Sequence, residues 1–416
     1  KMKKYIGLNT QGWLFSFLPI TLITGPFLAD LSLSLISLIF LLNKKIYLDK
    51  KYFKNYFFYF FVILNLYFVV SSLLSENPLF SLKSSFFYFR FYIFAIAVWY
   101  ILDQNEIWLV RFFNILKFSF IILLIDGFVQ YFFGKNIIGL EIHAGPRVSS
   151  FFGDELILGS YLSRLLPLLF GLLIYYYKEN KIKLYIFSSF FLIFSDVLVF
   201  LSGERTAFFF INLSSILIIL LINNFKTFRL ATYLIATLII LFLVNINPSS
   251  KNRIVDLTLD QFGVNNEKKY LISEEYEKIY ATGYEIFKEN KIFGMGPNMF
   301  RKKCKNLELT DKDRYQCTTH PHSTYLQILS ETGIFGMIIF VNILLFICFV
   351  MIKHFALRVF KKQDYIKDNL TICLIVSVFI SIFPFIPSGN FFNNYISIIY
   401  FLPVGILLWK LNLKNN

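Results

Sequence analysis

The chain alternates long apolar runs with short polar segments. About twelve of the runs are predicted to be membrane-spanning helices, because about 20 mainly apolar residues cross the hydrocarbon core of a bilayer. The first two runs are separated only by Gly25 and Pro26, so a single kinked segment is an alternative to two helices. The predicted spans are 14–28, 30–42, 56–74, 84–102, 112–133, 157–177, 184–202, 206–222, 228–246, 324–352, 370–387 and 391–409.

One long polar segment interrupts this series and divides the chain into unequal parts. The pattern predicts an all-α polytopic membrane protein with nine spans in residues 1–246, a loop domain in 247–321 and three spans in 322–416. No internal repeat is evident, which argues against a transporter built from repeats.

The basic residues of the short loops predict the topology. Lys and Arg are enriched in the segments that are cytoplasmic if twelve spans start from a cytoplasmic N-terminus, as the positive-inside rule requires. Both termini are therefore expected in the cytoplasm, and residues 247–321 on the outer side. The cytoplasmic cations include Lys44, Lys45, Lys50, Lys51, Lys54, Lys353, Arg358, Lys361, Lys362 and Lys367, whereas the short outer segments carry Lys83, Lys135, Arg147 and Arg205.

Composition supports a bilayer as the main partner. The 416 residues are 56% hydrophobic and 20% aromatic, with a mean hydropathy of +0.61, which exceeds what a soluble domain hides from water. The net charge of +15 is spread over many loops, so no nucleic-acid partner is expected. The basic N-terminus before an apolar run lacks a small-residue cleavage site and predicts a retained first helix.

Ionisable residues inside the predicted spans are functional candidates, because burying a charge in lipid is costly. Arg90, Arg164, Asp126 and Asp196 all fall in the outer half of their spans. The alternative is that the two arginines pair with the two aspartates to hold the bundle together. Arg205 lies at the outer start of the eighth span, where a snorkelling end residue is the alternative to a functional one.

The segment HPHSTYLQILSETGIFG (320–336) places two histidines where the outer loop re-enters the membrane. Pro321 suits the first turn of a helix, which predicts that the helix begins there and contains His322. The positive helix end would lower the pKa of His322 and keep the ring neutral, as a general base requires. A histidine that only caps the helix is the alternative. Glu331 lies nine residues after His322, on the opposite face of the predicted helix, so it is not expected to orient His322. Gly333 and Gly336 predict close helix packing.

The remaining chemistry in the outer loop concerns cysteines and acids. Cys304 and Cys317 are predicted to form a disulfide in an oxidising compartment. A zinc site that joins them to His320 and His322 fits no common ligand spacing. Asp311-Lys312-Asp313 resembles the acidic triplet of metal-dependent glycosyltransferases, but it lies in a charged turn. The sequence therefore predicts neither a metal nor a cofactor.

Four segments together resemble the O-antigen ligase and O-antigen polymerase superfamily. They are HPHSTYLQILSETGIFG, GMGPNMF (294–300), SGERTAF (202–208) and FFGDELILGSYLSRLLP (151–167). The resemblance implies a GT-C-type glycosyltransferase of the bacterial inner membrane with its active site facing the periplasm. It would transfer a glycan from undecaprenyl diphosphate to an acceptor hydroxyl, with inversion and without a metal.

The resemblance also implies roles for individual residues. His322 corresponds to the base that deprotonates the acceptor, and Arg205 to the diphosphate contact. Further candidates for binding the diphosphate or glycan are Arg90, Arg147, Arg164 and His320. The family's arginine before a tryptophan in the loop helix is missing: Tyr280 stands for the tryptophan, and Lys278 or Arg253 is the candidate replacement for the arginine.

The acceptor distinguishes the functions within this superfamily. A lipid A core acceptor is preferred, because the histidine segment and residues 151–167 look more like ligases. A repeat-unit polymerase and a protein O-oligosaccharyltransferase are alternatives. An ion-coupled transporter is the alternative of another class, but it is expected to bind its substrate near the middle of the membrane, whereas these charges lie toward one face.

Overall fold

A computed structural model describes residues 2–43, 46–47, 49–142, 147–246, 259 and 273–413, with side chains from residue 7 onward. Lys44, Lys45 and Arg253 lie outside these residues. The described part of the chain is almost entirely helical, and an isolated β-bridge pairs Lys135 with Glu141.

The helices follow the predicted runs closely. The main α-helices are α1 (Met2–Ile23), α2 (Pro26–Leu42), α3 (Tyr56–Leu73), α4 (Pro78–Ser85), α5 (Phe89–Gln104), α6 (Ile107–Phe133), α7 (Leu158–Tyr177), α8 (Lys181–Leu201), α9 (Arg205–Leu221), α10 (Lys226–Ile246), α13 (Glu274–Glu289), α14 (Phe300–Thr310), α15 (Thr324–Lys361), α16 (Asn369–Ser381) and α17 (Asn394–Asn412). Short 3₁₀ turns lie at Lys50–Tyr52, Phe86–Tyr88, Ser150–Phe152 and Asn223–Phe225.

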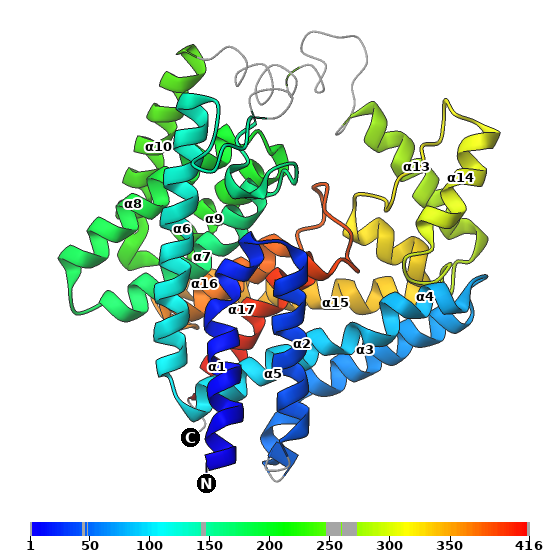
Figure 1. Ribbon diagram of the computed structural model, residues 1–416, viewed down its shortest axis with the longest axis horizontal. Helices are drawn as coiled ribbons and strands as arrows, with labels where there is room; N and C mark the ends of the chain where they lie inside the picture. Colours follow the sequence, from blue (N-terminus) through cyan, green and yellow to red (C-terminus); the bar gives the residue numbers. More distant parts are fainter. Residues whose placement is uncertain are drawn as a thin grey trace.

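Length and composition confirm a multi-pass membrane protein. Among the described residues, eight helices are long and apolar enough to cross a membrane, and α2, α9 and α16 are shorter apolar helices. The count of twelve spans stays a prediction. Figure 1 shows α1 beginning and α17 ending on the same side of the molecule, with α13 and α14 on the opposite side. Which of these sides faces the cytoplasm also stays a prediction.

The break between the first two predicted runs is real. Gly25 has a φ of 118° and Pro26 is the first residue of α2, so the backbone turns where only glycine is comfortable and restarts where proline's missing N–H costs nothing. The side-chain amide of Gln11 on α1 donates to the carbonyl of Ile36 on α2 at 2.9 Å. Two packed helices therefore replace the alternative of one kinked segment.

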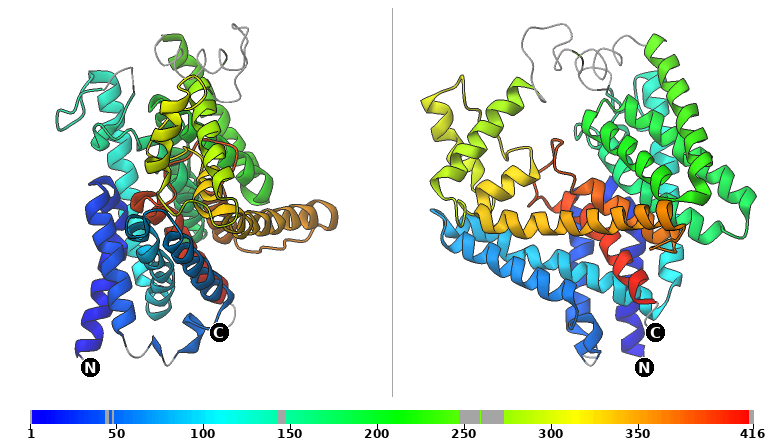
Figure 2. Two further views of the ribbon diagram at one scale, coloured as in Figure 1. Left: turned by 90° about the vertical axis from the view of Figure 1, so that its right-hand side faces the viewer. Right: turned by 180° about the vertical axis from the view of Figure 1, so that it is seen from behind.

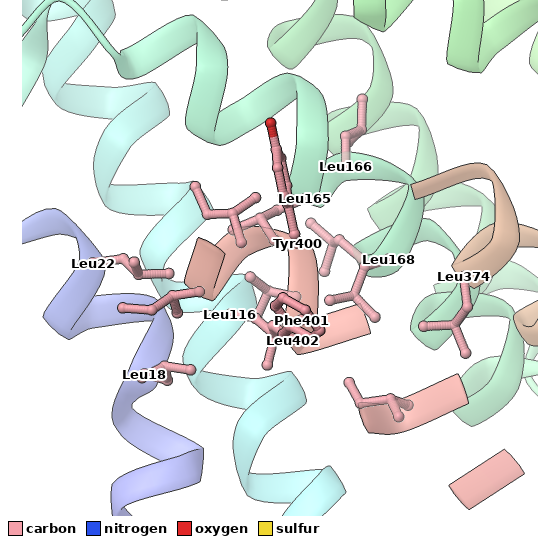
Figure 3. Packing of buried hydrophobic residues seen from close by; sticks show 14 of the residues in the cluster. Leu18, Leu22, Leu116, Leu165, Leu166, Leu168, Leu374, Tyr400, Phe401 and Leu402 are labelled. Carbon is pink, nitrogen blue, oxygen red and sulfur yellow. The ribbon is translucent and has the colours of Figure 1, made fainter. Parts of the chain in front are cut away.

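The core of the bundle forms around α7. Every residue from Leu158 to Ile174 except Ser160 is buried, as expected for a helix that is surrounded by others. Leucines of α1, α6, α7 and α16 meet Tyr400, Phe401 and Leu402 of α17 in this core (Figure 3). Gly171 allows α16 to approach, because an added Cβ would lie 2.7 Å from the Cβ of Cys373.

A glycine turn joins the segment that contains α13 and α14, residues 273–321, to α15; we call this segment the outer segment after its predicted side. Gly333 has a φ of 68° and kinks α15, while a Cβ on it would lie 2.2 Å from the carbonyl oxygen of Ile292. The N–H of Gly296 donates to the carbonyl of Glu331 at 2.8 Å, and the N–H of Ile334 donates to the carbonyl of Lys291 at 2.8 Å. The predicted close packing at Gly333 is thus between the helix and the backbone of the GMG turn.

The outer segment has a small core of its own. Ile279 and Ile286 of α13 pack with Met299, Phe300 and Cys304 around α14. Figure 2 shows α13 and α14 next to the end of α4 and the start of α15. This arrangement holds the histidine segment between α13 and the membrane helices.

Candidate functional site

The helix predicted to begin at Pro321 begins three residues later, at Thr324. Ser323 is its N-cap, and the Ser323 side chain accepts the N–H of Leu326 at 3.3 Å. His322 therefore precedes the helix, with a φ of 52° in the left-handed region. The prediction failed because serine caps a helix more effectively than proline starts one. The carbonyl of His322 accepts the N–H of Ser388 at 2.9 Å, which supports this unusual backbone.

Two imidazoles and a phenol lie together at this point. The ring centroids of His320 and His322 are 4.1 Å apart, and the ring of Tyr276 on α13 lies 5.7 Å from that of His322. His320 is buried; its Nδ1 lies 3.0 Å from the hydroxyl of Thr319, and its Nε2 has no hydrogen-bond partner among the described residues. His322 is only partly buried, so it is the ring more accessible to a substrate.

Both histidines are neutral at neutral pH. Burial lowers the pKa of His322 below its usual 6.5. Burial also lowers the pKa of His320 to about 3, with further lowering by the charges of His322 and Arg301. A neutral His322 was predicted, but the cause is loss of hydration and not the helix end, since the ring lies outside the helix.

The segment between α16 and α17 completes the surroundings of the histidines. α16 ends at Ser381, short of the predicted span, and the Ser388 hydroxyl accepts the N–H of Thr324 at 2.7 Å. Asn390 accepts a hydrogen bond from the side chain of Gln327 at 2.8 Å. Sequence reasoning missed this segment, although Pro384, Pro387 and Gly389 are signals against a continuous helix.

Glu331 has a structural role within the same network. Its carboxylate is fully buried and accepts the N–H of Phe300 at 3.1 Å and the side-chain amide of Gln327 at 3.0 Å. These bonds tie the start of α14 to α15. As predicted, Glu331 does not orient His322.

Arg205 is the first residue of α9, and Tyr276 is the residue that connects it to the histidines. The charge of Arg205 lowers the pKa of Tyr276, although burial outweighs it and the net shift is upward. The ring of Tyr276 also contacts that of His322. Arg205 is thus within electrostatic reach of the phenol that contacts His322.

Glu204 holds the start of α7 beside this arginine. Its carboxylate accepts the N–H of Gly159 at 2.6 Å and of Ser160 at 3.0 Å. Burial raises the pKa of Glu204 to about 7, while these bonds and the charges of Arg147 and Arg164 oppose the rise. Three of the predicted arginines therefore lie close to Glu204: Arg147, Arg164 and Arg205.

Arg164 does not pair with an aspartate as the alternative proposed. Its guanidinium hydrogen-bonds the hydroxyl of Ser160 and stacks over Phe210 at 4.8 Å. The side chain is 4% exposed, and its Nε has no partner among the described residues. No carboxylate of the described chain forms an ion pair with it, so it remains a candidate for binding an anion.

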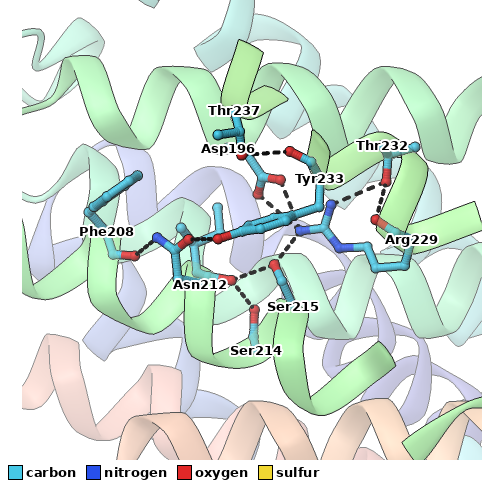
Figure 4. Close-up of polar contacts among 10 residues, drawn as sticks. Asp196, Phe208, Asn212, Ser214, Ser215, Arg229, Thr232, Tyr233 and Thr237 are labelled. Atoms are coloured by element: carbon cyan, nitrogen blue, oxygen red, sulfur yellow. Dashed lines mark hydrogen bonds and ion pairs between the residues drawn. The ribbon is translucent and has the colours of Figure 1, made fainter. Parts of the chain in front are cut away.

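The other intramembrane charges pair differently from the expected scheme. Arg90 forms an ion pair with Asp30 at 2.8 Å, and Asp126 accepts hydrogen bonds from Asn136, Ile137 and Ser150. Asp196 pairs with Arg229 at 2.9 Å inside a buried network with Ser215, Asn212 and Tyr233 (Figure 4). Arg90 therefore pairs with Asp30 and not with Asp126 or Asp196, and its role in substrate binding stays a prediction.

The candidates for the missing loop cation differ in position. Lys278 pairs with Glu274 at 3.2 Å along the surface of α13, while Arg253 lies outside the described residues. Arg301, at the start of α14, was not predicted, yet its charge reaches His320. Its place directly after the GMGPNMF motif was the available signal.

The loop cysteines are joined to each other. Cys304 and Cys317 form a disulfide, so neither offers a thiolate and the zinc alternative is wrong. Asp311 accepts the N–H groups of Asp313 and Arg314, both at 3.1 Å, as an acidic residue does in a turn.

The comparison with known families covers this region. Residues 187–341 match the family model described as O-Antigen ligase. The match extends from α8 into α15 and includes Arg205, Tyr276, both histidines and the glycine turn. No curated protein matches the chain. The stretch that contains the arginine and histidine motifs is therefore similar to the O-antigen ligase family.

Proposed function

We propose that this membrane enzyme transfers a glycan from undecaprenyl diphosphate to a hydroxyl of a lipid A core on the periplasmic face of the inner membrane. The observation that carries the proposal is the partly exposed His322, whose pKa is lowered by burial and whose ring contacts Tyr276, a phenol that the charge of Arg205 reaches. An inverting displacement needs a base for the attacking hydroxyl and a cation for the leaving group.

The proposed step follows from these two groups. A ring nitrogen of His322 takes the proton of the acceptor hydroxyl while the oxygen forms a bond to the anomeric carbon. The bond from that carbon to the diphosphate oxygen breaks, and its electron pair leaves with the diphosphate. Arg205 stabilises the developing charge, because a guanidinium offers paired donors that match phosphate oxygens.

Arg147 and Arg164 are proposed to assist at the diphosphate. Both act on Glu204, and Arg164 has a buried Nε without a partner among the described residues. Positive charge concentrated in this way compensates a diphosphate without a metal ion, so the proposed mechanism is metal-independent. Lys278 and Arg253 are weaker proposals, because the first already pairs with Glu274 and the second lies outside the described residues.

His320 is proposed to position His322 and not to carry the proton. A charge on His322 lowers the pKa of His320, so the adjacent rings do not both bind a proton near neutral pH. Thr319 and burial hold the ring of His320 in place. The pair therefore offers one accessible base.

The test is transfer by the purified full chain in nanodiscs. A diphosphate-linked glycan is supplied with a lipid A core, a growing glycan chain or a pilin-like peptide, and both released undecaprenyl diphosphate and enlarged acceptor are measured in EDTA. The proposal predicts an enlarged lipid A core. Transfer only to the glycan or only to the peptide would identify a polymerase or a protein glycosyltransferase instead. An absolute need for a divalent metal would contradict the metal-independent step.

A further inference from the structure

A basic pocket lies on the outer segment beside His320. Arg301, Lys302 and Lys305 of α14 line it together with Phe80 of α4, Thr318 and Thr319, and its volume is about 650 Å³. No acidic side chain is among the residues that line it. The pocket therefore presents three positive charges and two hydroxyls to whatever enters it.

Within the described chain, none of the three cations of this pocket forms an ion pair. The neighbouring Lys303 behaves differently: it pairs with both Glu76 and Glu289. Lys302 lies 5.0 Å from the centre of the Phe80 ring. Lys303 is therefore compensated by two carboxylates, whereas Lys302 and Lys305 form no ion pair within the described chain and Arg301 has only the buried Glu331 within electrostatic reach.

Arg301 shows the clearest unfilled requirement. One end of its guanidinium donates to the side chain of Asn298 at 2.9 Å. Its Nε is buried and has no hydrogen-bond partner among the described residues. A buried donor without a partner is costly, so the described chain does not fully satisfy this guanidinium.

The pocket is directly connected to the histidines. The hydroxyl of Thr319 lies 3.0 Å from Nδ1 of His320, and the hydroxyl of Thr318 donates to the His320 carbonyl at 2.7 Å. The His320 ring in turn contacts His322. Arg205 is therefore connected to His322 through Tyr276, whereas the pocket is connected to His322 through His320.

We propose that the basic pocket binds an anionic substituent, phosphoryl or carboxylate, on the acceptor glycan. This inference rests on the proposed function. In an inverting displacement the leaving diphosphate and the attacking hydroxyl lie on opposite sides of the anomeric carbon. With the diphosphate at Arg205, the cations beyond His320 lie next to the acceptor. The pocket thus selects acidic acceptors and orients their hydroxyl toward His322.

Binding is measured apart from transfer. The probe is a phosphorylated core oligosaccharide, released from lipopolysaccharide by mild acid and titrated calorimetrically into the detergent-solubilised full chain. The variants are wild type, Lys302→Gln/Lys305→Gln and Lys312→Gln. Lys312 is the matched control, since it is an exposed lysine of the same segment outside the pocket. Two further probes are the same oligosaccharide after removal of its phosphates and an unphosphorylated oligosaccharide that contains uronic acid.

We expect the double variant to bind the phosphorylated probe about tenfold more weakly, because contacts to two solvent-exposed lysines are lost. Lys312→Gln should bind as wild type does. Dephosphorylation should weaken binding to wild type by a similar factor, and retained binding of the uronic acid probe would show that carboxylate serves as well. Equal binding by wild type and the double variant, or no binding by wild type, would contradict the proposal that the pocket binds an anionic substituent. Intact binding without glycan transfer would instead count against the proposed function.

Discussion

The protonation state of His322 limits when it can act as a base. Because burial lowers its pKa below the usual 6.5, the ring loses its basic form only at a lower pH than an exposed histidine does. We therefore expect the acidic limb of kcat/KM for transfer to be centred below about pH 6.5. The measurement is a pH profile of initial rates with saturating donor. An acidic limb centred at or above 6.5 would contradict a buried, neutral base.

Arg205 depends on the shape of its side chain as well as on its charge. If it holds the diphosphate, Arg205→Ala should lower kcat by roughly 10²–10³-fold, as removal of one donor to a developing charge does. Arg205→Lys should recover only part of this loss, since an ammonium does not reproduce the paired donors. Steady-state kinetics of both variants provides the comparison. Full activity of the lysine variant would show that only a positive charge is needed there.

At the scale of single residues, the sequence predicts the helix that holds a charge better than it predicts the partner of that charge. Hydropathy places Arg90 and Asp196 inside apolar helices, and both lie in helices long and apolar enough to cross a membrane. Their partners are Asp30 and Arg229, because pairing depends on how each helix is rotated and shifted against its neighbours, which the pattern of one span does not encode. The start of α15 was misplaced for a local reason, the competition between Pro321 and Ser323 for the helix end.

Among the elements, the contact between the glycine turn and α15 is the tightest near the site. Gly333→Ala should destabilise the protein by about 2 kcal/mol or more, since alanine disfavours a positive φ and its Cβ would collide with backbone. The carbonyl oxygen of Ile292 would lie 2.2 Å away. The free energy of unfolding, measured by SDS titration in mixed micelles, tests this.

Gly7→Ala is the matched control for that experiment. A Cβ at Gly7 on α1 would meet only the side chain of Ile39 at an ordinary 3.5 Å. It should leave the free energy of unfolding unchanged or raise it by about 0.5 kcal/mol. Equal stability of the two variants would mean that the backbone contact at Gly333 is absent.

The ion pair between α8 and α10 provides a second test at this scale. Asp196→Ala leaves Arg229 buried and uncompensated and should cost about 3 kcal/mol of stability. The pair is buried on both sides, whereas Lys288 and Glu285 form an exposed pair on α13. Lys288→Ala should therefore have no measurable effect.

A double replacement separates charge from packing at this pair. Asp196→Leu combined with Arg229→Met should recover most of the stability lost in Asp196→Ala, because no unpaired charge remains. The same SDS titration measures it. A double variant as unstable as Asp196→Ala would show that the surrounding network, including Ser215, needs the charged groups themselves.

The helices themselves were largely predictable, because each apolar run is long and bounded by polar residues or proline. The boundaries failed where tertiary contacts override the pattern. α15 continues to Lys361 and kinks at Gly333, where it packs on the glycine turn. α16 ends at Ser381, because the following segment hydrogen-bonds to Thr324 and Gln327 and not to its own helix.

The whole molecule places its chemistry where the outer segment meets the bundle. α13 and α14 lie on the side opposite the chain ends, and α15 runs crosswise to α1 and α2 (Figures 1 and 2). Residues far apart in sequence, such as Tyr276 and Asn390, thereby approach one histidine segment. Motif resemblance predicts roles for His322 and Arg205, but the basic pocket around Arg301 became visible only once α4 and α14 were packed together.

The most direct test of the central claim is the turnover of His322→Ala beside His320→Ala in the glycan transfer assay. If His322 is the base, its removal should lower kcat at least about 10²-fold, while donor binding and the free energy of unfolding stay close to wild type. His320→Ala, which removes a positioning residue, should lose less. Wild-type turnover in His322→Ala, or a larger loss in His320→Ala, would contradict the assignment of His322 as the base.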